Sequence, residues 1–180
     1  MTGSLAEAIA AHWAPRADLA RIRKDLERRG VFPPTTPEDL AAHDQLHAGG
    51  LPATRQFAEW VGVGDGTRVL DLGAGLGGAA RLLAREHGAR IRAVDLAAAL
   101  VESGAQLTEW MGLEARVMHR VGDLDAVGVG ERFDLIWLQH VDMHVPDKAA
   151  LYAGCAKRLA DAGRVVWHDW LAGPGGALHW

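Results

Sequence analysis

The chain has 180 residues, with a hydrophobic content of 49% and a charged content of 23%, values that suit one packed domain. Its 19 basic and 23 acidic side chains give a formal net charge of −4 at pH 7, so no overall positive field attracts nucleic acid or an anionic membrane. The single cysteine, Cys155, excludes an internal disulfide, and we recognise neither a signal peptide nor an apolar run of membrane-spanning length. We therefore expect a cytoplasmic protein with no nucleic-acid or membrane partner.

Residues 1–50 predict a helical extension to the main domain. Its first two helices are expected over residues 1–13 and 16–29. The basic side chains of the second are interleaved with acidic ones, which favours a solvated face over a nucleic-acid contact. Thr36 followed by Pro37 predicts the start of a third helix. We expect this extension to act as a lid over the site described below.

Residues 51–180 alternate short apolar runs with amphipathic segments, the pattern of an α/β domain. This alternation implies a doubly wound, mostly parallel sheet of five strands, whose ligands bind beyond the carboxyl ends of the strands. Phe57 and Trp60 are expected to be buried, and Leu159 is expected to continue the buried face of the last helix. Strands are expected at residues 68–72, 91–95, 115–121, 133–139 and 163–170, and helices at 53–61, 79–87, 97–111 and 147–161.

A glycine-rich loop follows the first expected strand, in the stretch from Val69 to Gly78. Glycines let backbone N–H groups approach a ligand closely, and the N-terminus of the following helix adds partial positive charge. The spacing Gly73-x-Gly75-x-x-Gly78 also fits the dinucleotide fingerprint, so a nicotinamide-dependent oxidoreductase is an alternative. Asp71 argues against it, because a carboxylate there repels a pyrophosphate and attracts a ligand that carries an ammonium group.

The same stretch resembles motif I of the class I S-adenosylmethionine-dependent methyltransferases, in which an acidic residue precedes a Gly-x-Gly-x-Gly loop. Asp95 ends the next apolar run and matches the acid that binds the ribose hydroxyls. Residues 44–54 and 141–148 are similar to segments of small-molecule methyltransferases, including enzymes that methylate glycine-type amines, quinols and sterols. The resemblance implies a Rossmann-like methyltransferase fold, S-adenosyl-L-methionine as cofactor and a small-molecule substrate.

The resemblance also implies which residues form the site. Asp123 matches the acid that caps the adenine amino group, whereas His47 has the alternative of simply capping a helix C-terminus. His140 and His144 are the candidate catalytic residues, as acceptors of a proton from an amine substrate. The expected cofactor-binding residues are His47, Asp71, Gly73, Ala74, Gly75, Asp95, Leu96, Gly122, Asp123, Leu124 and Gln139.

A polar cluster near the expected ends of the fourth and fifth strands raises the question of a metal. It consists of His140, Asp142, His144, His168 and Asp169. Metal-dependent methyltransferases chelate a catechol through a carboxylate-rich triad in this region, and that spacing is not found here. We therefore expect no metal, and interpret the cluster as the polar lining of a cleft.

The resemblance covers residues 44–170 and then stops. The family sheet has seven strands, and residues 171–180 are too few to form the last two. We therefore expect the fifth strand to leave an open edge that associates with a second copy in a homodimer. Two alternatives remain: a monomer whose N-terminal helices cover that edge, and a non-catalytic remnant that only binds S-adenosylmethionine.

Overall fold

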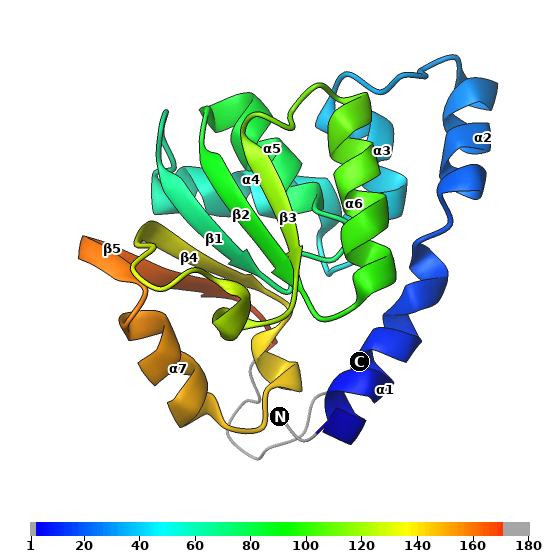
Figure 1. Ribbon diagram of the computed structural model, residues 1–180. Coiled ribbons are helices and arrows are strands. Elements are labelled where there is room, and N and C mark those ends of the chain that lie inside the picture. The colour runs from blue at the N-terminus through cyan, green and yellow to red at the C-terminus, as the bar shows by residue number, and fades with distance from the viewer. Residues whose placement is uncertain (1–2, 171–180) are drawn as a thin grey trace.

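The computed structural model describes residues 3–170 as a single sheet flanked by helices (Figure 1). No helix in this range is long and apolar enough to cross a membrane. Residues 171–180 lie outside the described residues, and with them the expectation that no further strands follow. In chain order the elements are α1 (Gly3–Trp13), η1 (Ala14–Arg16), α2 (Leu19–Arg29), α3 (Pro37–Asp44), α4 (Gly50–Val61), β1 (Arg68–Leu72), α5 (Gly78–His87), β2 (Arg90–Asp95), α6 (Ala98–Trp110), β3 (Val117–Val121), η2 (Leu124–Ala126), β4 (Phe133–Gln139), η3 (Asp142–His144), α7 (Lys148–Ala156) and β5 (Leu159–His168).

The five strands form one parallel sheet in the order β3-β2-β1-β4-β5, which confirms the predicted doubly wound architecture. β1 lies at the centre, and its last residue, Leu72, pairs with Val94 of β2 and with Leu138 of β4. Because all strands run in the same direction, their carboxyl ends meet at one edge of the sheet. The chain order reverses beside β1, and ligands bind at such a point in open α/β sheets.

Each face of the sheet has its own apolar core, because successive side chains of a strand point to opposite faces. Val69 and Trp137 face the larger core, which the helices α4, α5 and α6 cover together with α2 and α3. Leu70 and Ile136 face the smaller core, which is covered by α7 and includes Cys155. Figure 1 shows the same division, with α7 on the side of the sheet opposite to α4, α5 and α6.

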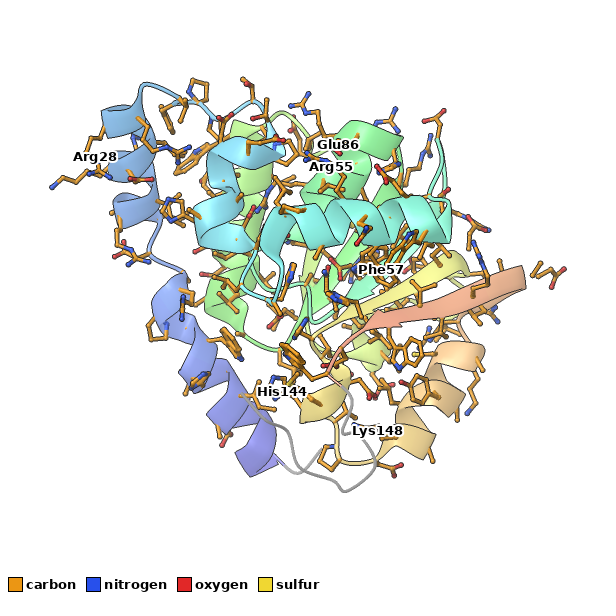
Figure 2. The ribbon with its side chains drawn as sticks, turned by 180° about the vertical axis from the view of Figure 1, so that it is seen from behind. Arg28, Arg55, Phe57, Glu86, His144 and Lys148 are labelled. Atoms are coloured by element: carbon orange, nitrogen blue, oxygen red, sulfur yellow. The ribbon has the colours of Figure 1, made fainter. Side chains whose placement is uncertain are left out.

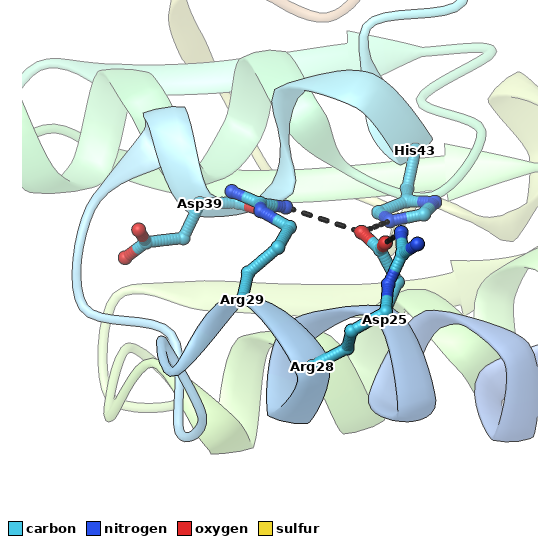
Figure 3. Close-up of polar contacts among 5 residues, drawn as sticks. All are labelled: Asp25, Arg28, Arg29, Asp39 and His43. Atoms are coloured by element: carbon cyan, nitrogen blue, oxygen red, sulfur yellow. Dashed lines mark hydrogen bonds and ion pairs between the residues drawn. The ribbon is translucent and has the colours of Figure 1, made fainter.

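The helix α2 is attached to the body by both apolar and polar contacts. Its residues Ile22 and Leu26 are fully buried in the larger core. Between α2 and α3 the carboxylate of Asp25 accepts hydrogen bonds from Arg28 and Arg29 of α2 and contacts His43 of α3, as Figure 3 shows. These hydrogen bonds hold the pKa of Asp25 well below its usual range, the one from Arg28 having the largest effect. The extension is therefore continuous with the core.

Two expectations for the helices before the sheet are wrong in detail. The second helix begins at Leu19 and not at residue 16, because the side chain of Asp18 caps it by accepting a hydrogen bond from the backbone N–H of Arg21 at 2.9 Å. Trp60 is 77% exposed, although it was expected to be buried. The buried face of α4 is set by the helical repeat of Leu51, Thr54, Ala58 and Val61, and Trp60 lies outside it.

The end of the last helix also differs from the expectation. α7 stops at Ala156, so Leu159 does not extend its apolar face but begins β5, where it pairs with Phe133. The side chain of Arg158 stabilises this early end by donating hydrogen bonds to the carbonyls of Leu124, Val127 and Gly128 at 2.8 to 3.2 Å. Periodicity alone does not reveal these loop carbonyls, which lie some thirty residues away along the chain.

Candidate functional site

A cavity of about 900 Å³ lies at the carboxyl edge of the sheet. The loops after β1, β2, β3 and β4 line it, together with α1 and the segment between α3 and α4. Every residue proposed from the sequence for cofactor binding or catalysis lines this one cavity. They are His47, Asp71, Gly73, Ala74, Gly75, Asp95, Leu96, Gly122, Asp123, Leu124, Gln139, His140 and His144.

Hydrogen bonds to the end of β2 fix the conformation of the glycine loop after β1. The N–H groups of Gly73 and Ala74 both donate to the carbonyl of Val94, at 2.8 and 3.0 Å. The N–H of Gly75 donates to Oδ2 of Asp95 at 2.8 Å. Gly75 has a φ of +56°, and a Cβ added there would have no atom of the described residues within 4 Å. The loop thus presents bare backbone to the cavity.

Two carboxylates, one buried and one partly buried, flank this loop. Asp71 is only 2% exposed, and its Oδ2 has no hydrogen-bond partner among the described residues. Burial, and then the neighbouring Asp95, raise the pKa of Asp71 to about 7. Burial also raises the pKa of Asp95, although that carboxylate accepts hydrogen bonds from the N–H groups of Gly75 and Ala97. A ligand cation beside Asp71 would satisfy the charge that the chain itself leaves unpaired.

A buried ion pair joins α5, the helix after the glycine loop, to the end of α3. The sequence pattern did not predict this pair. Arg81 of α5 and Asp44 at the end of α3 are 1% and 3% exposed, and Nη2 of Arg81 lies 2.7 Å from Oδ2 of Asp44. Arg81 also donates to the carbonyl of Gly104 on α6 at 3.1 Å. A Cβ at Gly78 would lie 2.6 Å from the carbonyl oxygen of Asp44, so this glycine allows α5 to approach α3. Asp44 itself lines the cavity.

The loop after β3 supplies the third acidic position. Gly122 has a φ of +134°, and its backbone N–H donates to the carbonyl of Asp95 at 2.8 Å. The side chain of Asp123 caps the turn η2 by accepting from the N–H of Asp125 at 2.9 Å, and it is exposed. Asp123 thus keeps a second carboxylate oxygen for a ligand donor.

Imidazoles gather where β4 and β5 end. His140 follows β4 in a left-handed backbone conformation, with a φ of +56°, and its N–H donates to the carbonyl of His168 at 2.9 Å. Burial lowers the pKa of both His140 and His47. Both rings are therefore neutral near pH 7 and able to accept a proton. His144 is exposed on the turn η3, near α1, as Figure 2 shows.

His47 lies in the segment between α3 and α4, beyond the end of α3. The C-cap of that helix is Gln45, so His47 does not serve as the helix cap. Its Nδ1 is 3.1 Å from the carbonyl of Ala48, and its Nε2 is 3.0 Å from both the Thr54 hydroxyl and Oε1 of Gln45. Thr54 continues this network to Gln139, whose Nε2 lies 3.1 Å from Oγ1 of Thr54.

The polar cluster expected from the sequence is only partly brought together. Asp142 accepts a hydrogen bond from the hydroxyl of Tyr152 at 3.1 Å, and Asp169 accepts one from the backbone N–H of Met143 at 3.2 Å. The carboxylates therefore bond to groups other than the histidines. His47 joins His140 and His168 instead, a relationship that spacing along the chain did not reveal.

The sequence of this chain matches the profile of a family described as "Methyltransferase domain" over residues 69–163. A probable tocopherol O-methyltransferase of Oryza sativa is 33% identical over 103 residues, which are 57% of this chain and 28% of that protein. The glycine/sarcosine/dimethylglycine N-methyltransferase of Actinopolyspora halophila is 29% identical over 139 residues, 77% of this chain and 24% of the relative. The chain thus spans about a quarter of the length of these curated relatives.

Solved structures agree with the fold. A phosphoethanolamine N-methyltransferase 2 of Haemonchus contortus, crystallised with phosphomonomethylethanolamine and S-adenosylhomocysteine, has a TM-score of 0.65 at 25% identity. The similarity covers 81% of this chain and 35% of that one. These comparisons identify the Rossmann-like methyltransferase fold and give no support to the nicotinamide-dependent oxidoreductase alternative.

Proposed function

Because the chain belongs to the methyltransferase domain family, we propose that it binds S-adenosyl-L-methionine and transfers its methyl group to a small molecule. One observation carries this proposal. Asp71 lies one residue before the end of β1 and Asp95 ends the neighbouring strand β2. Both flank a bare glycine loop and line the same cavity of about 900 Å³. A pyrophosphate would meet two carboxylates there, whereas an amino-acid ammonium and a ribose would each meet a partner.

The residues present fit this cofactor. Oδ2 of Asp71 has no partner among the described residues and suits an ammonium group. Asp95 suits the ribose hydroxyls, because its carboxylate retains lone-pair positions beyond those that accept the backbone N–H groups of Gly75 and Ala97. Leu96 and Leu124 offer apolar contacts to an adenine ring, whose amino group would donate to Asp123. His47, Ala74, Gly122 and Gln139 are proposed as further lining contacts.

When bound, the cofactor would supply a methyl group on a positively charged sulfur, which is a good leaving group. The chain would then contribute chiefly position and the exclusion of water. An amine nucleophile must be neutral to react, and His140 is placed to accept its proton, because burial keeps this imidazole neutral. His144, exposed on η3, would act in the same role from the mouth of the cavity.

We propose an amine as the first substrate class to examine. The relatives and the solved structure include N-methyltransferases of glycine, sarcosine and phosphoethanolamine, and neutral imidazoles near the cavity suit an amine. An oxygen nucleophile is the second class, since one relative is an O-methyltransferase. Assays with radiolabelled S-adenosylmethionine and panels of both classes separate them. Transfer to neither, with cofactor binding intact, would favour the non-catalytic remnant.

Isothermal titration of the chain with S-adenosylhomocysteine, and separately with NAD, tests the cofactor assignment. We expect binding of the first and not of the second. The variant Asp71→Asn should weaken S-adenosylhomocysteine binding, whereas Asp65→Asn, an exposed acid outside the cavity, should not. Binding of NAD alone would overturn the proposal.

We propose that residues 1–50 form an extension to an α/β domain of residues 51–180, and that α1 of this extension acts as a lid. The position of α1 supports the lid. Ile9 and Trp13 line the cavity, so movement of α1 would change access to it. Deleting α1 should raise both the association and the dissociation rate of S-adenosylhomocysteine. Unchanged rates would argue against a lid.

Self-association and cellular compartment are further proposals. β5 is the outermost strand of the described sheet, and Trp167 on it is 50% exposed, which favours pairing with a second copy. Sedimentation velocity over a concentration series tests this, and Trp167→Lys should reduce the dimer fraction.

The one cysteine, Cys155, is a buried free thiol and suits a reducing compartment such as the cytoplasm.

A further inference from the structure

Three histidines from distant parts of the chain converge at one end of the cavity. His47 precedes α4, His140 follows β4 and His168 ends β5. One ring nitrogen of each lies within 4.8 Å of the corresponding nitrogens of the other two. The ring centroids are separated by 5.6 Å for His47 and His140, 6.3 Å for His47 and His168, and 5.2 Å for His140 and His168. We propose that these three imidazoles bind a divalent transition-metal cation such as Zn²⁺.

The hydrogen bonds of the rings indicate which nitrogens would bind the cation. The carbonyl of Ala48 can only accept, so Nδ1 of His47 would keep its proton in the metal-bound form and Nε2 would offer its lone pair to the cation. A ligating histidine usually donates its other N–H to such a carbonyl, which fixes the ring for the metal. The indole N–H of Trp137 donates to Oε1 of Gln139 at 3.2 Å, so Nε2 of Gln139 faces Nδ1 of His168 at 3.3 Å. Nδ1 of His168 therefore carries a lone pair and would be the second ligand atom.

The third ring has the least satisfied nitrogen. Nε2 of His140 is buried and has no hydrogen-bond partner among residues 3–170. His140 is also one of two non-glycine residues in the described chain with a positive φ, a conformation that is uncommon and that clusters at functional sites. Three lone pairs on nitrogens within 4.8 Å of one another would repel, and a bound cation would remove that repulsion.

The donor set indicates the class of metal. Imidazole suits Zn²⁺, Co²⁺ and related cations, whereas Mg²⁺ and Ca²⁺ require oxygen ligands. The two nearby carboxylates are engaged elsewhere, Asp142 with Tyr152 and Asp169 with the backbone of Met143. Three protein ligands leave a fourth position for water or substrate, and His47 and His140 both line the cavity. In the metal-bound form His140 would be a ligand, so His144 would be the acceptor of the proton of an amine substrate.

Binding would require a small rearrangement. Nitrogens on a tetrahedral Zn²⁺ lie about 2.0–2.1 Å from the metal, so the three rings would draw closer together. The cation would replace three contacts of ordinary length. The Thr54 hydroxyl and Oε1 of Gln45 each lie 3.0 Å from Nε2 of His47, and the Gln139 amide lies 3.3 Å from Nδ1 of His168. This inference reverses the expectation of no metal, which considered a cluster without His47.

The test uses the chain without a polyhistidine tag, freed of metal with a chelator and then titrated with CoCl₂. We expect one equivalent of Co²⁺ to give the visible absorption of a tetrahedral site, and Zn²⁺ to displace it. His140→Asn removes the ring but retains a residue that tolerates a left-handed backbone, and it should weaken Co²⁺ binding by at least about tenfold. His12→Gln, an exposed histidine outside the trio, is the matched control and should bind as the unaltered chain does.

A second variant and a second readout keep the test decisive. If His140→Asn fails to fold, His168→Gln removes another ligand. Addition of Zn²⁺ should raise the melting temperature of the unaltered chain but not that of a ligand variant, since a ligand of the folded state stabilises it. Absence of both the Co²⁺ spectrum and the Zn²⁺ shift, or equal binding by a folded ligand variant, would overturn the metal site. Neither readout requires S-adenosylmethionine, so failure here is distinct from failure of the proposed function.

Discussion

Oδ2 of Asp95 accepts a hydrogen bond from the backbone N–H of Gly75 at 2.8 Å, so the acid at the end of β2 also shapes the glycine loop after β1. The two residues are separated by 20 positions in the sequence. Asp95 is therefore proposed to have two tasks, one toward a ribose and one toward the loop. A substitution at this position should affect both.

The first prediction separates these tasks. Asp95→Ala removes the ligand contact and the loop contact, and should weaken S-adenosylhomocysteine binding by about 1–3 kcal/mol. Asp95→Asn keeps an oxygen that can accept from the N–H of Gly75, so its loss should be smaller. Isothermal titration of both variants checks this order. Equal and unchanged affinity in both would contradict the assignment of Asp95 to the cofactor.

The second prediction concerns pH and Asp71. Its pKa is raised from 3.8 to about 7 in the folded chain, so the folded state binds this proton more tightly than the unfolded state. The contribution of Asp71 to stability is therefore greatest below about pH 4 and falls as the pH rises to about 7. By pH 8 the penalty is on the order of 4 kcal/mol.

Urea unfolding of the ligand-free chain and of Asp71→Asn at pH 5 and pH 8 measures this effect. The variant should gain stability relative to the unaltered chain as the pH rises, because an amide does not ionise. The same variant should bind S-adenosylhomocysteine less well at pH 8, where the carboxylate would face the ammonium. A stability difference that does not change with pH would show that Asp71 is not held in this state.

The third prediction concerns the buried pair of Arg81 and Asp44. Replacing Asp44 by Ala leaves a guanidinium that is 1% exposed without its carboxylate, which should cost about 3–5 kcal/mol of unfolding free energy. Glu27→Gln breaks the exposed pair with Arg23, whose side chains are 56% and 50% exposed, and should cost less than about 1 kcal/mol. Chemical denaturation compares the two. Similar small losses would mean that water or a rearrangement satisfies Arg81.

Much of the site could be predicted because motif residues at strand ends must meet at one edge of a parallel sheet. That rule placed Asp71, Asp95 and Asp123 together before any contact was known. It could not place His47 beside His168, or Arg81 beside Asp44, because these contacts depend on how the segments before the sheet fold back onto it. The early end of α7 was missed for a related reason, because it depends on the loop carbonyls that Arg158 contacts. The exposure of Trp60 has another cause, since the helical repeat of α4 places Trp60 outside its buried face.

The last prediction tests whether the bare backbone of the glycine loop is the ligand surface. Gly73 is a poor probe, because a Cβ there would lie 2.3 Å from Cγ2 of Val141 and would disturb the loop itself. Gly75 is better, since its Cβ would meet no described atom within 4 Å and would project where the ligand is proposed to lie. Gly75→Val should therefore abolish S-adenosylhomocysteine binding. The positive φ of +56° adds a strain of about 1–2 kcal/mol, so the variant should be less stable but folded.

The matched control for this strain is Gly112→Val, at a φ of +65° with equally open surroundings and outside the cavity. It should lose similar stability and keep its affinity for S-adenosylhomocysteine, as measured by thermal unfolding and isothermal titration. Parallel loss of affinity in both variants would indicate that backbone strain, and not occupation of the ligand surface, explains the effect at Gly75. Retained affinity in a folded Gly75→Val chain would show that the ligand does not approach the loop at this residue, because a valine side chain leaves no room for such an approach.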